Sequence, residues 1–283
     1  MKKVQYPISN PDGTSNAITV FSLDDKVDSK KVILLFPAMG VAASYYEPFA
    51  EKLVNAGFEV ITADIRGHGL SSERASRKTD FGYREIVELD YPAVTAKVKS
   101  LYPDQQYYIM GHSLGGQMAS LYASRGDDDC AGLILIACCS VYYKGWSGLM
   151  GPGTYLFTQV FGFLPKIIGY FPGKRIGFAG TEPRTQMQDW AYQARTGRYH
   201  PNGSDFDYEM ALSELKIPVL AISLDGDSYA PPKAVKHLLG KFHSDAPIDY
   251  QHLSKEDMGV PKVTHFSWVK IPGKLINYIA DWF

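Results

Sequence analysis

Four near-continuous apolar runs recur in the first 140 residues of the chain, and segments with helical spacing lie between them. The runs occupy residues 31–36, 58–63, 107–110 and 130–137. Such runs are typical of strands that are buried on both faces of a parallel sheet. Parallel neighbours joined through helices require right-handed crossovers. The alternation therefore predicts an α/β fold with a doubly wound, mostly parallel sheet.

This alternation stops near residue 140 and returns at residues 217–223. The intervening stretch, 141–210, is rich in Gly, Pro, Tyr, Phe and Trp. With short strands expected at 4–8 and 17–23, the run at 130–137 is the sixth strand. We therefore predict an aromatic-rich helical lid inserted after the sixth strand, over the sheet edge where ligands of α/β proteins bind. The expected division is a core of 1–140 and 211–283 with a lid or cap of 141–210.

A small-x-Ser-x-small motif, Gly-His-Ser-Leu-Gly, occupies residues 111–115 between a predicted strand and a predicted helix. A serine in this context sits on a turn so tight that larger side chains two residues away would collide. Gly111 and Gly115 remove that collision. The turn also places Ser113 at a helix N-terminus, where backbone N–H groups favour developing negative charge. We predict that Ser113 is a nucleophile; the alternative is a glycine-rich turn with a surface serine.

A serine hydroxyl needs a histidine to accept its proton and a carboxylate to orient that histidine. At a strand–turn–helix serine site, the acid and then the histidine follow the serine along the chain. Residues 224–232 follow the strand after the insertion and offer Asp225 and Asp227. We choose Asp227, which precedes the turn into the next helix. Asp225 stays as the alternative acid, with a turn residue as its other role.

The base is expected after the last strand and before the last helix, and His265 lies there. Each of the other histidines considered is placed less well for this role. His112 lies inside the serine motif and is expected to point away from the serine. The others lie too early in the chain: His68, His200, His243 and His252.

Stabilising a tetrahedral oxyanion requires two backbone N–H donors that point at one site. Leu114, the residue after the predicted nucleophile, supplies one. The second is expected from the loop after the first long buried strand, at Met39. Ala38 and Gly40 on either side are small enough for close backbone approach. The alternative is that this loop only ends the strand.

Together these motifs resemble those of the α/β-hydrolase superfamily, over nearly the whole chain. The segments that carry the resemblance are 64–71 (DIRGHGLS), 111–116 (GHSLGG), 227–231 (DSYAP) and 264–266 (THF). A narrower similarity, through segments such as 171–177, links the chain to a little-characterised bacterial group of predicted α/β hydrolases. One departure is that Pro37 and Ala38 stand where many relatives have His-Gly. In such relatives the 64–71 loop is structural, which argues against a catalytic His68.

The aromatic insertion has a predicted role and an alternative. We expect it to pack on the sheet edge and to line a pocket for an acyl group; the alternative is a packed cap without substrate contact. Its apolar stretch at 155–164 is too short and too broken to span a bilayer. Lys174, Arg175 and Arg184 form either a site for an anionic head group or a solvated face.

Charge, cysteine content and the start of the sequence bear on the partners, the redox state and the location of the protein. The formal net charge of −1 gives no reason to expect nucleic acid as a partner. The three cysteines, Cys130, Cys138 and Cys139, lie in or beside one apolar run, which predicts reduced, buried thiols. No apolar stretch follows the lysines at the start, so we expect no signal peptide and a cytoplasmic protein.

The expected activity is that of a serine hydrolase of the carboxylesterase or lipase kind. It would cleave a carboxylic ester or thioester with an apolar acyl group through an acyl-enzyme, without a metal or an organic cofactor. A small-molecule acyl compound is the expected partner, and the oligomeric state stays open. The alternatives are an acyltransferase with the same triad, a peptidase for small N-terminal residues, and a non-catalytic ligand-binding protein.

Overall fold

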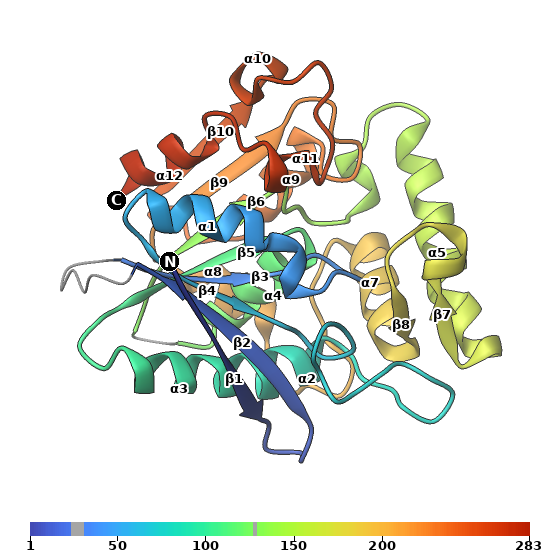
Figure 1. The fold of residues 1–283 in the computed structure, drawn as a ribbon. Coiled ribbons are helices and arrows are strands. Elements are labelled where there is room, and N and C mark those ends of the chain that lie inside the picture. The colour runs from blue at the N-terminus through green and yellow to red at the C-terminus, as the bar shows by residue number, and fades with distance from the viewer. Residues whose placement is uncertain (24–30, 127–128) are drawn as a thin grey trace.

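A mixed sheet of eight strands forms the centre of the computed structural model, which describes residues 1–23, 31–126 and 129–283 (Figure 1). Along the sheet the strand order is β1-β2-β4-β3-β5-β6-β9-β10. The bounds are β1 (Lys2–Ser9), β2 (Ser15–Ser22), β3 (Val32–Phe36), β4 (Glu59–Ala63), β5 (Tyr107–His112), β6 (Cys130–Ile136), β9 (Val219–Leu224) and β10 (Ile248–Leu253).

Six of these strands run parallel, which confirms the predicted fold class. From β4 across to β10 every neighbouring pair is parallel, whereas β1 and β2 form an antiparallel hairpin at one edge. The strands β3, β4, β5, β6 and β9 are almost wholly buried. Burial on both faces explains why their sequences are apolar runs and do not alternate.

Helices cover both faces of the sheet, with α1 and α12 on one side and α3 on the other (Figure 1). The helices of the core are η1 (Ala43–Tyr46), α1 (Glu47–Asn55), α2 (Tyr83–Glu85), η2 (Ile86–Asp90), α3 (Tyr91–Leu101), α4 (Leu114–Ala123), α9 (Pro232–Leu239), α10 (Lys255–Met258), α11 (Ser267–Lys270) and α12 (Leu275–Trp282). The segment 83–101 is helical throughout, with a wider turn at η2.

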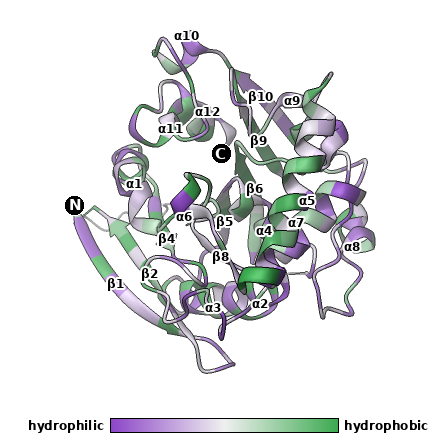
Figure 2. Ribbon diagram, turned by 90° about the vertical axis from the view of Figure 1, so that its right-hand side faces the viewer, coloured by the Kyte–Doolittle hydropathy of each residue, from purple (hydrophilic) through white to green (hydrophobic). Residues whose placement is uncertain are grey.

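Most of the chain between β6 and β9 forms a helical cap beside the sheet. Its elements are η3 (Tyr143–Gly145), α5 (Met150–Ile168), β7 (Tyr170–Pro172), α6 (Gly173–Ile176), β8 (Thr181–Pro183) and α7 (Arg184–Thr196). The last helix before β9, α8 (Tyr208–Glu214), packs against α4 of the core. The antiparallel pair β7–β8 is an addition to the prediction, which placed no strands here. Apolar residues concentrate on the central strands and on α5 (Figure 2). No helix within the described ranges is long and apolar enough to cross a membrane.

The carboxyl ends of the central strands meet at the edge of the sheet that faces the cap (Figure 1). Phe36 at the end of β3 pairs with Gly111 of β5, and β6 lies on the other side of β5. The loops that follow β3, β5, β9 and β10 carry Met39, Ser113, Asp227 and His265, in that order. Parallel pairing therefore gathers residues that are far apart in sequence at one edge.

Candidate active site

Ser113 lies on a strained turn between β5 and α4. Its backbone angles are φ 53° and ψ −118°, a region that residues with a side chain rarely adopt. A Cβ on Gly111 would lie 2.2 Å from Cα of Gly116, and one on Gly115 would lie 2.5 Å from the carbonyl oxygen of Pro37. Glycine is therefore required at both positions, as the motif predicts.

Asp227 and His265 form a buried pair. Oδ2 of Asp227 lies 2.7 Å from Nδ1 of His265, and the two residues are 5% and 6% exposed. The other carboxylate oxygen, Oδ1, accepts hydrogen bonds from the backbone N–H groups of Tyr229 and Ala230 at 2.9 and 3.2 Å. The carboxylate is thus held by its own turn, with one oxygen free for the imidazole. Asp225, the alternative acid, is exposed.

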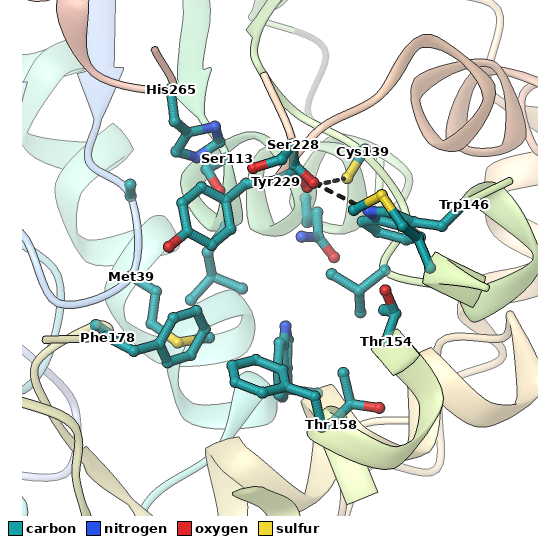
Figure 3. A pocket seen from close by; sticks show the side chains of 18 of the residues that line it. Met39, Ser113, Cys139, Trp146, Thr154, Thr158, Phe178, Ser228, Tyr229 and His265 are labelled. Atoms are coloured by element: carbon teal, nitrogen blue, oxygen red, sulfur yellow. Dashed lines mark hydrogen bonds between the residues drawn. The ribbon is translucent and has the colours of Figure 1, made fainter. Parts of the chain in front are cut away.

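Ser113 and His265 line the same cavity, with Tyr229 beside them (Figure 3). Within the described residues no hydrogen bond joins the Ser113 hydroxyl to the imidazole. Such catalytic hydrogen bonds are often long without substrate and tighten when it binds. The structure thus brings the three predicted residues to one site, with the Asp227–His265 contact already formed.

Met39 and Leu114, the predicted backbone donors, also line this cavity. Neither N–H has an acceptor among the described residues. The neighbouring N–H of Ala38 is used, since it donates to the hydroxyl of Tyr46 at 3.0 Å. The loop after β3 is therefore anchored at Ala38 and leaves the next N–H available.

Tyr46 connects this loop to the serine motif. Its hydroxyl, which accepts from Ala38, lies 2.6 Å from Nδ1 of His112, and its side chain is fully buried. Nδ1 of His112 is the one acceptor within reach of the buried Tyr46 O–H among the described residues, so the hydroxyl donates its hydrogen to Nδ1. Burial, and secondly the neighbouring His265, hold the pKa of His112 well below its usual value, so the ring is neutral and accepts that hydrogen.

His112 also packs against the loop that carries His265. The centroids of the two imidazole rings are 4.6 Å apart, and the Trp268 ring lies 5.1 Å from that of His112. The indole Nε1–H of Trp268 donates to the backbone oxygen of His265 at 3.1 Å. Sequence reasoning assigned no task to His112 or Tyr46, yet they join three of the loops around the cavity.

The 64–71 loop has structural contacts, as expected. Asp64 accepts backbone N–H bonds from Ala43 (2.8 Å) and Leu70 (3.0 Å), while burial raises the pKa of its carboxyl. Arg66 forms a buried ion pair with Asp90, at 2.7 Å. These contacts hold the loops on either side of β4 in place.

His68, from the same loop, contacts the cap. Its Nε2 lies 3.2 Å from Oε2 of Glu182 in β8, a glutamate with no exposed surface. Oε1 of Glu182 accepts the N–H of Gly180 at 2.8 Å. A Cβ on Gly40 would lie 2.1 Å from the backbone nitrogen of Gly180. The backbone of the cap therefore touches the loop that carries Met39.

The cavity has a volume of about 520 Å³, a size typical of small-molecule sites. The core contributes its polar end, and the cap contributes a mostly apolar wall. That wall is formed by Trp146, Met150, Gly153, Thr154, Phe157, Thr158, Gly177, Phe178, Ala179 and Trp190.

The basic residues of the insertion lie outside the cavity lining. Arg184 forms an ion pair with Asp80 at 2.8 Å, and Lys174 and Arg175 are exposed on α6. All three cysteines are buried, and burial raises the pKa of the Cys138 and Cys139 thiols. Among the described residues, no group of three or more His, Cys, Asp or Glu side chains is arranged to hold a metal ion.

A protein-family model, "Serine aminopeptidase, S33", matches residues 27–164 of the chain. Over 110 residues the chain is 28% identical to a monoglyceride lipase homolog from Monkeypox virus, covering 38% of each protein. It is also 28% identical over 108 residues to the monoglyceride lipase of Homo sapiens, covering 38% of this chain and 35% of that protein. The chain thus matches little more than a third of the length of these curated relatives.

Solved structures resemble the fold over nearly the whole chain. An esterase from Exiguobacterium antarcticum superimposes with a TM-score of 0.63 at 15% sequence identity, covering 98% of both chains. The strand order, the strained serine turn and these likenesses in sequence and structure agree with one another. The chain has the fold of the α/β hydrolases.

Proposed function

We propose that the protein is a serine hydrolase that cleaves a carboxylic ester or thioester with an apolar acyl group. The observation that carries the proposal is the cavity itself. It combines a strained serine and a carboxylate-held histidine at one end with a wall of aromatic and aliphatic side chains. The monoglyceride lipases and the esterase among the similar proteins support ester hydrolysis.

In the proposed mechanism Asp227 orients the base. An ionised carboxylate only accepts hydrogen bonds, so Nδ1 of His265 carries the hydrogen and Nε2 is left as an acceptor. Nε2 then takes the proton of the Ser113 hydroxyl as its oxygen attacks the substrate carbonyl carbon. The carboxylate stabilises the imidazolium that forms.

The tetrahedral oxyanion would be stabilised by the N–H groups of Met39 and Leu114. Leu114 also begins α4, so the helix dipole favours the negative charge there. Collapse of the intermediate gives the leaving alcohol or thiol a proton from His265. Water, activated by the same histidine, then releases the acyl group from Ser113.

The insertion, residues 141–210, is proposed as the lid over this site. Its residues Phe157, Phe178 and Trp190 pack together and line the cavity. An acyl chain placed there would replace water at apolar surface, a favourable transfer of about 25 cal/mol per Å². This wall is the part of the site that would select an apolar acyl group.

A peptidase for small N-terminal residues is supported less well. Such an enzyme must bind a protonated amine, and a carboxylate near the scissile bond would stabilise it. Among the described residues no Asp or Glu lines the cavity, and the nearby Asp227 is already paired with His265. The geometry therefore favours an uncharged acyl group.

A fluorophosphonate probe tests the nucleophile. We expect the wild-type protein to be labelled and Ser113→Ala to show no labelling while keeping its circular dichroism spectrum. Ser228→Ala is a matched control, since Ser228 also lines the cavity but lies outside the proposed triad. Equal labelling of wild type and Ser113→Ala would refute the assignment.

Substrate class is tested with p-nitrophenyl esters of increasing chain length. We expect kcat/KM to rise as the acyl chain grows into the apolar wall. Product analysis with added alcohols and amines separates hydrolysis from acyl transfer, because a transferase would yield the new ester or amide. An absence of turnover across the whole panel would favour the ligand-binding alternative.

A further inference from the structure

Gln117 is a buried polar residue for which the proposed reaction has no use. It lies on α4, one helical turn after Ser113, so both side chains are on the same side of the helix. It is 3% exposed and lines the cavity. A glutamine at this depth loses its hydration and therefore needs hydrogen-bond partners.

Among the residues that the structure describes, one group is a partner for the Gln117 amide. Its Oε1 accepts a hydrogen bond from the Tyr199 hydroxyl, 2.9 Å away. Within the described residues, Nε2 has no hydrogen-bond partner. Nε2 is not one of the described side-chain atoms that are both fully buried and unpartnered. It is therefore accessible at the surface of the cavity that Gln117 lines.

Tyr199 determines which way the amide points. The residue is 3% exposed, and burial raises the pKa of its hydroxyl well above the usual value, so the O–H keeps its hydrogen. Gln117 Oε1 is the one acceptor that this O–H has among the described residues. Donation from Tyr199 to Oε1 leaves the two N–H bonds of Nε2 to face the cavity.

We propose that Gln117 binds an oxygen atom carried by the acyl chain itself, so that the preferred substrates are oxo- or hydroxyacyl compounds. This inference rests on the proposed function, because it assumes that the acyl group occupies the cavity. Gln117 would then determine specificity within the class of apolar acyl groups. The acyl groups that it selects would carry an oxygen atom near the carbonyl carbon.

The spacing along α4 restricts where that oxygen lies. One helical turn advances about 5.4 Å, and an N–H···O hydrogen bond spans about 2.9 Å. An acceptor for Nε2 is therefore expected roughly two to four bonds from the carbonyl carbon that Ser113 attacks. An oxygen on the third carbon of the acyl chain meets this condition.

An unsubstituted acyl chain would leave the N–H groups of Gln117 against hydrocarbon. Sites built to hydrogen-bond a substrate group discriminate against analogues that lack the group, because the polar atom of the protein is then unpaired. We expect a preference of about tenfold or more in kcat/KM for the oxygenated acyl group, which corresponds to about 1.4 kcal/mol.

The test compares three N-acetylcysteamine thioesters: hexanoyl, 3-hydroxyhexanoyl and 3-oxohexanoyl. Release of the thiol is followed with a chromogenic disulfide. For the wild type, both oxygenated thioesters are expected to exceed the hexanoyl thioester about tenfold in kcat/KM. Gln117→Leu should bring this ratio to about one. Tyr199→Phe should lower the ratio less, since the amide stays but loses its orienting partner.

Gln251→Leu is the matched control for the substitution. Gln251 lies on β10, outside the cavity lining, where its Nε2 donates to Asp249. It should keep the wild-type ratio. Because the ratio is measured first on the wild type, the test stands even if Gln117→Leu fails to fold.

The outcomes separate the inference from the proposed function. Hydrolysis of all three thioesters by the wild type at equal rates would overturn the role of Gln117 and leave the hydrolase function intact. A preference for the hydroxy compound together with no preference for the oxo compound over hexanoyl would overturn the assignment of Nε2 as a donor, because a ketone oxygen can only accept a hydrogen bond. No turnover of any thioester or ester would refute the hydrolase function and this inference with it.

Discussion

Removing the Tyr46 hydroxyl tests whether its two hydrogen bonds stabilise the loops of the candidate active site. This hydroxyl accepts from the N–H of Ala38 at 3.0 Å and donates to Nδ1 of His112 at 2.6 Å. Tyr46→Phe keeps the buried ring and leaves both partners without a hydrogen bond. Each unsatisfied buried group costs about 1–3 kcal/mol, so for the two groups we expect the free energy of unfolding to fall by about 2–6 kcal/mol.

Catalysis should suffer beyond this loss of stability. The Ala38 N–H is the anchor of the loop that presents Met39, and a displacement of about 1 Å in an active site costs up to about 100-fold in rate. We expect kcat for an ester substrate to fall about 10- to 100-fold while KM changes less than about threefold, because the cavity wall is untouched.

Urea unfolding and steady-state kinetics measure the two effects. Tyr45→Phe is the control, since that neighbouring ring is 36% exposed; it should change neither quantity. A Tyr46→Phe protein that unfolds within about 0.5 kcal/mol of the wild type and keeps its kcat would refute the argument.

Three further predictions follow from the geometry. Asp227→Asn should lower kcat about 10³- to 10⁴-fold, because an amide favours the wrong tautomer of His265, whereas Asp225→Asn should leave steady-state rates unchanged. Gly115→Ala should lower the melting temperature, since its Cβ would lie 2.5 Å from a backbone oxygen; Gly153→Ala, in open space within α5, should raise stability by about 0.5–1 kcal/mol in calorimetry. Burial raises the pKa of Asp189 from 3.8 to about 7. Between about pH 4 and pH 7 the folded state therefore holds a proton that the unfolded state has lost. Stability falls as pH rises across this window and levels off above about pH 7, and Asp189→Asn should flatten the decline in denaturant titrations at about pH 5 to 7.5.

Much of the fold could be predicted because a strand that is buried on both faces has a continuous run of apolar residues in its sequence. The run at 31–36 and the helix after Ser113 are examples, and the structure differs from them by only a few residues. Chain order alone placed Asp227 and His265 in loops at one edge of the sheet, and the structure pairs their side chains. Their catalytic roles stay predictions.

The cap was harder to predict, for physical reasons. Each strand of the β7–β8 pair has three residues, too few to show a period of two.

Two side-chain contacts of the core differ in how far the sequence could predict them. The hydrogen bond between Tyr46 and His112 joins residues 66 positions apart, and no sequence motif indicates it. Gln117 did carry a signal, since it lies four residues after Ser113 on a predicted helix, and that spacing places it on the serine face.

The contact between Gly40 and Gly180 has a consequence for engineering. Neither glycine has room for a Cβ, and Glu182 bonds to Gly180 while it contacts His68 of the core. A cap grafted from another protein would need a glycine at the same point and a carboxylate two residues later. Substrate range can therefore be redesigned by varying the wall on α5, whereas the 180–182 stretch and residue 40 must be exchanged as one unit.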